Sequence, residues 1–205
     1  MSRLAIKICG LSTPETVGAA VRAGASHLGF VHFPKSPRHV EADHMRALAA
    51  SVPAHVGRVA VVVDADDAEL ARIVGTEAIS ALQLHGKESP ERVAAVKERF
   101  GLKVMKAISV STTDDIENAK SNYDGVADFL LFDAKPPKDS VLPGGNAVST
   151  CSVRFPAKNS FSFLSSTLKN LGNGVLGRAT PSRTLFRKQR RQSSHRNVKS
   201  DGANL

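Results

Sequence analysis

The sequence has few cysteines and no long run of apolar residues. Its two cysteines, Cys9 and Cys151, stand among 205 residues, which is too few for the disulfide framework of a small secreted protein. The longest apolar run, around residues 59–63, is far shorter than the ~20 residues that cross a bilayer. Charged residues within the first seven positions argue against a signal peptide. These absences exclude membrane, disulfide-rich secreted and collagen classes, and we expect a cytoplasmic protein.

Acidic residues are nearly absent from the last part of the chain. Residues 1–146 hold 17 Lys and Arg against 18 Asp and Glu, whereas residues 147–205 hold 11 Lys and Arg against one acid, Asp201. The overall net charge of +9 therefore comes from the second segment. So sharp an asymmetry indicates a basic tail or a segment of different origin.

The first 146 residues alternate short β-branched or apolar runs with Ala-, Glu- and Arg-rich stretches of helical spacing. Two of these stretches open with a capping residue followed by proline and an acid, at Thr13-Pro14-Glu15 and at Ser89-Pro90-Glu91. The predicted strands are 4–8, 27–32, 57–63, 78–84, 103–108 and 128–132.

Repeated alternation of strand and helix predicts an α/β fold with a parallel sheet and right-handed crossovers. The candidate architectures are a doubly wound sheet and a β/α barrel. The sequence lacks GxGxxG after its first strand and lacks GxxxxGK[ST] throughout, which disfavours dinucleotide and P-loop sites. Polar residues instead follow many of the strands, for example Cys9, Asp64, His85, Lys106 and Asp133. This distribution is typical of a (β/α)8 barrel, although only six of its eight strands are recognisable.

The periodic pattern fades after Asn146. Ser, Arg, Lys and Asn dominate from there, the spacing over 161–171 indicates at most a short helix, and the composition after Arg178 is typical of disorder. We therefore divide the chain into a barrel portion, 1–146, and a basic, Ser-rich tail, 147–205. A barrel lacking its last two strands would leave the first and sixth strands with open edges.

Cys9 and Asp133 are the candidate catalytic residues. Cys9 ends the first strand before Gly10, and the nearby Lys7 and helix start favour a thiolate. Asp133 follows four apolar residues at the end of the sixth strand. In a barrel both would face the mouth, where one accepts and the other donates a proton. The structural alternatives are a buried small hydrophobe for Cys9 and a loop or cap aspartate for Asp133.

Five further residues suit ligand binding. Arg38 follows two prolines in 34–38, and its guanidinium fits a carboxylate or phosphate. Gln83 and His85 share one face of the fourth strand's end, and Gly144-Gly145 lets backbone amides approach a ligand. The alternatives are a surface arginine, a structural hydrogen-bonded pair and a plain turn. No histidines show metal-ligand spacing, so we expect no metal.

Taken in order, these segments resemble phosphoribosylanthranilate isomerase over roughly residues 3–146. The resemblance rests on five motifs, each weak alone but specific together: Lys7-Ile8-Cys9-Gly10-Leu11, Gly29-Phe30 with Ser36-Pro37-Arg38, Gln83-Leu84-His85-Gly86, Phe132-Asp133-Ala134-Lys135 and Pro143-Gly144-Gly145-Asn146.

The resemblance implies an intramolecular aldose–ketose isomerase of tryptophan biosynthesis. This family rearranges N-(5-phosphoribosyl)anthranilate, a small phosphosugar, to 1-(o-carboxyphenylamino)-1-deoxyribulose 5-phosphate without a cofactor. By resemblance Asp133 is the general acid, Cys9 the general base and Arg38 the carboxylate ligand. Gln83 and His85 lie at the rim of the site, and we expect a monomer that binds no membrane and no nucleic acid.

The chain departs from the family after Asn146. The Gly-Gly-Leu motif and the Asp-Val-Ser-Ser-Gly-Val-Glu motif, which belong to strands seven and eight, are absent, and the loops after these strands are where a barrel binds phosphate. Our hypothesis for this departure is a reading-frame shift near codon 146, so an inactive product of such a gene is one alternative. A nucleic-acid-binding module using 187–191 is a more distant one. Other barrel sugar-phosphate isomerases and indole-glycerol-phosphate synthase are further alternatives. The synthase is disfavoured because the first strand begins at Leu4.

Overall fold

A computed structural model describes the backbone of residues 5–134, 152–154 and 163–167, and the side chains of residues 5–133. All six predicted strands are present and alternate with five helices in this part of the chain. In chain order the elements are β1 (Ala5–Cys9), α1 (Pro14–Arg22), β2 (His27–His32), α2 (Ala42–Ala49), β3 (Gly57–Val62), α3 (Asp67–Gly75), β4 (Ala81–Leu84), α4 (Pro90–Phe100), β5 (Lys103–Val110), α5 (Thr113–Tyr123), β6 (Phe129–Ala134), β7 (Ser152–Arg154) and β8 (Phe163–Thr167).

The two proline-marked helix starts are found where the sequence predicted them. Thr13 is the N-cap of α1 and accepts a hydrogen bond from the backbone N–H of Thr16, while Ser89 caps α4 in the same way through the N–H of Arg92. In both helices the proline occupies the first turn, where its missing N–H costs nothing.

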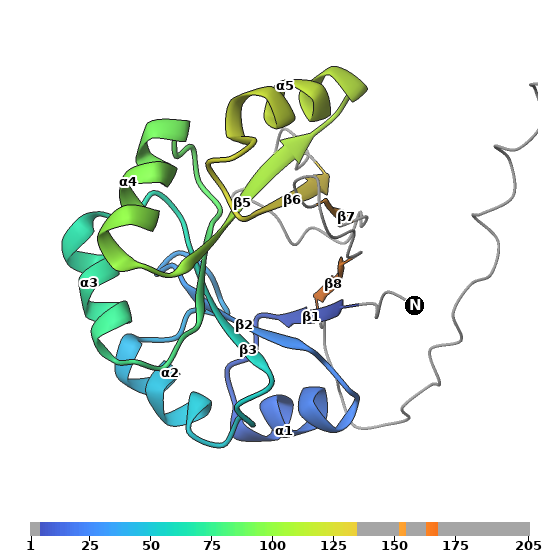
Figure 1. The fold of residues 1–205 in the computed structure, drawn as a ribbon. Coiled ribbons are helices and arrows are strands. Elements are labelled where there is room, and N and C mark those ends of the chain that lie inside the picture. The colour runs from blue at the N-terminus through green and yellow to red at the C-terminus, as the bar shows by residue number, and fades with distance from the viewer. Residues whose placement is uncertain (1–4, 135–151, 155–162, 168–205) are drawn as a thin grey trace, which may run out of the picture. The chain divides into compact units, whose positions relative to one another are not determined.

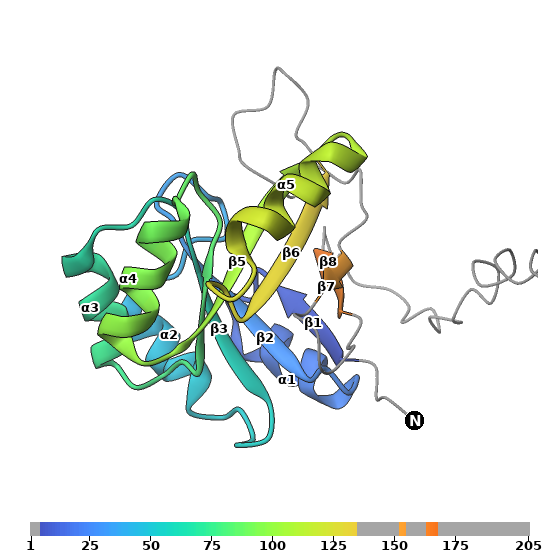
Figure 2. The same ribbon diagram turned by 45° about the horizontal axis from the view of Figure 1, so that its top comes forward.

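Strands β1 to β6 form one parallel sheet in sequence order. Helices α1 to α5 lie on its outer side, each between the two strands that it connects (Figures 1 and 2). This arrangement confirms the predicted α/β fold, and it brings the C-terminal ends of all six strands to the same end of the sheet.

The apolar residues separate into two layers because successive strand side chains point to opposite faces. One cluster joins strand residues such as Leu28, Val62 and Leu82 to the helices. The other contains strand residues alone, namely Met105, Ala107 and Leu131, with Ala5 and Phe129 packed against them. The second cluster therefore marks the inner face of the sheet.

The expectation of open edges on the first and sixth strands is wrong. β1 pairs in parallel with β8, β6 pairs with β7, and β7 pairs with β8, so the eight strands form a closed barrel. Both pairings of β7 are antiparallel, unlike the parallel pairing among β1 to β6. The unpaired N–H and C=O groups of an edge strand pair readily with another extended segment. Here the chain after β6 supplies the two short strands β7 and β8. The short helix considered for 161–171 is also wrong, because β8 occupies its centre.

The chain divides into two units, Met1–Asn170 and Leu171–Leu205. The second unit and the proposed boundary at residue 146 lie outside the described residues. Within the described part, no helix has the length and apolar character needed to cross a membrane.

Candidate active site

Cys9 lies at the C-terminal end of β1, where the chain turns sharply. It is half-buried and shares the inner face of the strand with Ala5 and Lys7. The turn is made by Gly10, which has φ +82°, a conformation that other residues rarely adopt. The N–H groups of Gly10 and Leu11 both donate to the carbonyl of Gly29, at 2.9 and 3.2 Å, and this fixes the Cys9 backbone against β2.

Arg38 extends across Gly10. A Cβ atom at Gly10 would lie 2.7 Å from Cδ of Arg38 and 3.1 Å from one of its terminal guanidinium nitrogens. The Arg38 backbone N–H donates to the hydroxyl of Ser36 at 3.2 Å, so the loop after β2 is held in place. The missing side chain of Gly10 thus lets a partly buried guanidinium lie directly over the residue that follows Cys9.

His85 and Asp133 meet at the ends of β4 and β6. Nε2 of His85 lies 3.6 Å from a carboxylate oxygen of Asp133, and the two side chains are 18% and 21% exposed. The amide N–H of buried Gln83 donates to Nδ1 of His85 at 2.7 Å. Because Nδ1 accepts this bond, the neutral ring carries its proton on Nε2, facing Asp133.

The structure thus assembles five of the predicted site residues in two groups. Cys9 with Arg38 forms one group, and Gln83 with His85 and Asp133 forms the other. Cys9, Gln83 and Asp133 all belong to the inner faces of parallel strands, near their C-terminal ends, so the two groups share one mouth of the barrel. Gly144 and Gly145, the remaining predicted pair, lie outside the described residues.

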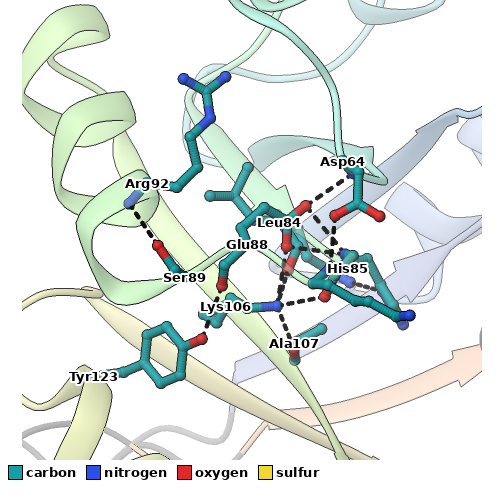
Figure 3. A network of polar contacts seen from close by, with 12 residues as sticks. Asp64, Leu84, His85, Glu88, Ser89, Arg92, Lys106, Ala107 and Tyr123 are labelled. Carbon is teal, nitrogen blue, oxygen red and sulfur yellow. Dashed lines mark hydrogen bonds and ion pairs between the residues drawn. The ribbon is translucent and has the colours of Figure 1, made fainter.

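The prediction missed a buried ion pair behind this mouth (Figure 3). Lys106 alternates with the inner residues Met105 and Ala107, so it belongs to the opposite face of β5 and does not enter the mouth. Its Nζ donates to the carboxylate of Glu88 at 3.0 Å and to the carbonyls of Gly86 and Ala107 at 2.8 Å. The acid two residues after His85-Gly86 was a signal in the sequence that could have suggested this pair.

The Glu88 carboxylate ties the loops after β3 and β4 together. It accepts the backbone N–H groups of Asp64 and Gly86, at 3.0 Å each, while the Tyr123 hydroxyl donates to the Glu88 carbonyl at 2.8 Å. Burial raises the pKa of Tyr123, and the negative charges of Glu88 and Glu91 raise it further. This network holds the backbone on both sides of His85.

One cluster outside the mouth, formed by His32, His39 and Glu41, has the spacing of a metal site, with one ligand atom of each lying within 4.8 Å of the others. Hydrogen bonds already occupy the His39 ring, because Nδ1 accepts the N–H of Phe33 and Nε2 therefore carries the proton that it shares with Glu41. Nδ1 of His32 donates to the carbonyl of Val40. These bonds leave His39 without a lone pair for a metal, so the cluster is best explained as structural.

Comparison with known proteins shows a family of sequences that are similar to this chain. The sequence model of the family described as N-(5'-phosphoribosyl)anthranilate (PRA) isomerase matches residues 6–154. The chain belongs to the PRA isomerase family. The N-(5'-phosphoribosyl)anthranilate isomerase of Brucella canis is 56% identical over 146 residues, which make up 71% of this chain and 65% of that protein.

Solved PRA isomerases share the fold. The enzyme from Thermotoga maritima is 32% identical with a TM-score of 0.62, over 70% of this chain and 66% of that chain. A second PRA isomerase structure, in complex with reduced 1-(o-carboxyphenylamino)-1-deoxyribulose 5-phosphate, is 32% identical with a TM-score of 0.59, over 64% of this chain and 66% of that one. The present chain therefore spans about two thirds of the length of the PRA isomerases that it matches.

Proposed function

We propose that this chain catalyses the PRA isomerase reaction, the Amadori rearrangement of N-(5-phosphoribosyl)anthranilate to 1-(o-carboxyphenylamino)-1-deoxyribulose 5-phosphate in tryptophan biosynthesis. The observation that carries the proposal is the position of Cys9 and Asp133. In a chain of this family, the Cys9 thiol lies at the C-terminal end of β1 and the Asp133 carboxyl group near the C-terminal end of β6. Both belong to the inner face of the sheet, at the same mouth of the barrel. An aldose–ketose rearrangement needs one acid and one base at separate points of a small substrate.

In the proposed mechanism Asp133 is the general acid that donates a proton to the furanose ring oxygen. The C1–O bond breaks as the anilino nitrogen supplies its electron pair, which leaves a protonated Schiff base. The Cys9 thiolate then removes the proton from C2, and the C2–H electrons form the enamine. Tautomerisation of the enol at C2 gives the ketone. Every step is a proton or electron-pair shift, so no metal or redox cofactor takes part.

The remaining site residues are proposed to bind substrate. Arg38 holds the anthranilate carboxylate, for which its planar fork is suited. Oε1 of Gln83 is buried and has no hydrogen-bond partner among the described residues, so it is available to a substrate hydroxyl. His85 directs its Nε2 proton at Asp133 and holds that carboxyl group in place. Gly144 and Gly145 are proposed to offer backbone amides to the ligand.

The test is isomerase activity of the purified 205-residue chain, followed by the loss of phosphoribosylanthranilate fluorescence. We expect turnover in the parent chain and at least about a hundredfold lower kcat in Cys9→Ala and in Asp133→Asn, since general acid–base groups contribute roughly 10² to 10⁴. Lys87→Ala, an exposed change in the loop after β4, is the matched control and should retain the parent rate. Equal rates in parent and both active-site variants would refute the assignment.

A second candidate is a product of the same gene family that folds without turning over substrate. The observation that favours it is β7, which runs antiparallel to β6, whereas a (β/α)8 barrel has parallel strands throughout. The phosphate-binding loops of such a barrel follow strands seven and eight. No turnover at any substrate concentration, from a chain with a cooperative unfolding transition, would favour this candidate.

We propose a cytoplasmic monomer whose partner is the phosphosugar substrate. One known relative is described as mutually generated monomers of a dimeric isomerase from Thermotoga maritima. Light scattering on the purified chain tests the monomer, since a mass near twice 21.8 kDa would contradict it.

A further inference from the structure

Lys7 is a buried cation that the proposed reaction does not use. It lies on the inner face of β1, two residues before Cys9, and is 0% exposed. Burying an ammonium group is very unfavourable unless an opposite charge or several hydrogen-bond acceptors compensate it. An ammonium group beneath the mouth of the barrel therefore needs a counter-charge or several acceptors close to it.

The described residues offer Lys7 no conventional partner. Its Nζ is buried and has no hydrogen-bond partner within that part of the chain. The contrast with Lys106 is informative, because that equally buried ammonium contacts the Glu88 carboxylate and backbone carbonyls. Glu88 is thereby committed to Lys106, on the opposite face of the wall.

Gly29 shows where the Lys7 ammonium points. A Cβ atom at Gly29 would lie 2.8 Å from Sγ of Cys9 and 2.9 Å from Nζ of Lys7. The thiol and the ammonium therefore approach the same point on β2, where Gly29 pairs with Cys9 across the sheet. The absence of a side chain at Gly29 makes room for both groups.

We propose that Lys7 is the fixed counter-charge of the Cys9 thiolate. The Cys9 thiolate that takes the C2 proton pairs with the Lys7 ammonium, which compensates its negative charge at the strand end. Lys7 is a positioning residue that acts through Cys9. This role rests on the proposed function, in which Cys9 is the base.

Other charged groups around Cys9 are compatible with this pair. Arg38 adds positive charge from the loop after β2, and Asp133 with His85 faces the same mouth from β6 and β4. His27 is the partner of Lys7 across β1 and β2. Burial lowers the pKa of His27, and the charge of Lys7 lowers it further, as does that of Lys103.

The experiment measures iodoacetamide alkylation of Cys9 against pH, by mass spectrometry of the Cys9 peptide. Thiolate sulfur displaces iodide, so the rate reports the ionised form. We expect Lys7→Met to slow the reaction at neutral pH by about tenfold or more, and Lys7→Arg to restore part of the rate. Lys103→Met, which removes an exposed cation from β5, is the matched control. The Cys151 peptide of each sample reports any change in reagent or pH.

The decisive result is the difference between Lys7→Met and the parent at neutral pH. Equal rates across the pH range in two chains with the same circular dichroism spectrum would overturn the proposal. Should Lys7→Met fail to fold, the parent chain alone decides: Cys9 must react faster at neutral pH when native than in urea, although it is partly buried, and a slower native rate would also overturn the proposal.

The readout is independent of isomerase activity. A parent chain that shows the Lys7 effect on alkylation but no turnover would contradict the proposed function and support the pair. A parent chain with turnover should lose kcat in Lys7→Met while KM changes little, because the charge acts on the base and not on substrate binding.

Discussion

Removing one partner of the Lys106–Glu88 pair is expected to lower the free energy of unfolding more than other single polar changes in the described part of the chain. Both side chains are almost fully buried, at 3% and 4% exposure. Lys106→Met keeps the aliphatic volume but leaves a buried carboxylate without its cation and backbone carbonyls without their donor. Removing one partner of a buried ion pair costs roughly 3 to 5 kcal/mol. For a chain of this size, that loss lowers Tm by on the order of 10 °C.

Urea unfolding followed by circular dichroism measures this cost. We expect a lower midpoint at an unchanged slope, because the surface exposed on unfolding stays the same. Lys120→Met is the matched control: Lys120 pairs with Glu117 at i,i+3 on the surface, and such pairs contribute at most about 0.5 kcal/mol. The double variant Lys106→Met, Glu88→Gln should be less destabilised than the sum of its single changes, because the orphaned charge is gone.

A cost of less than about 1 kcal/mol for Lys106→Met, the upper limit for an exposed ion pair, would contradict this prediction. A double variant that loses the full sum of the single changes would contradict it equally. Either result would mean that the ammonium and the carboxylate do not compensate each other inside the wall.

Three further predictions concern single positions. Gly10→Ala forces a residue with a Cβ into φ +82° and against Arg38, so thermal unfolding should show a loss of about 1 to 3 kcal/mol, and substrate KM should rise. The pKa of His27 is lowered in the folded state. As pH drops through the ordinary value of 6.5, the unfolded chain therefore binds the proton first and the free energy of unfolding falls. Urea midpoints measured between pH 5 and 8, the range in which histidine titrates, should decline less steeply in His27→Phe than in the parent chain. The pKa of Tyr123 is raised in the folded state, so the free energy of unfolding should fall as pH rises above 10.0. Tyr123→Phe should remove this loss of stability at high pH. The same change should cost about 1 kcal/mol at neutral pH, because it removes the hydrogen bond to the Glu88 carbonyl.

The strands and helices could be predicted from the sequence because their formation depends on interactions between residues close along the chain. Apolar β-branched runs predicted β1 to β6, and the cap-proline-acid signals at Thr13 and Ser89 predicted the starts of α1 and α4. The same alternation placed Cys9 and Asp133 at strand ends. For these features, side-chain preference and backbone geometry act within a few residues.

The closure of the sheet into a barrel could not be predicted from the sequence pattern. The segment after Asn146 lacks the motifs of strands seven and eight, and its composition is typical of disorder. Nevertheless β7 and β8 pair with the edges of β6 and β1. Backbone hydrogen bonding has little dependence on side-chain identity, so an available edge decides this pairing more than the segment's own pattern does.

Lys7 and Lys106 separate what the sequence determined by itself from what the tertiary structure decided. The sequence placed Lys7 in the first strand, two residues before Cys9, and Lys106 in the fifth strand. It did not determine that Lys106 meets Glu88 while Lys7 meets no described acid and points with Cys9 at Gly29. Pairing of buried charges depends on which strands and loops become neighbours across the barrel, and that information arises only when distant segments pack together.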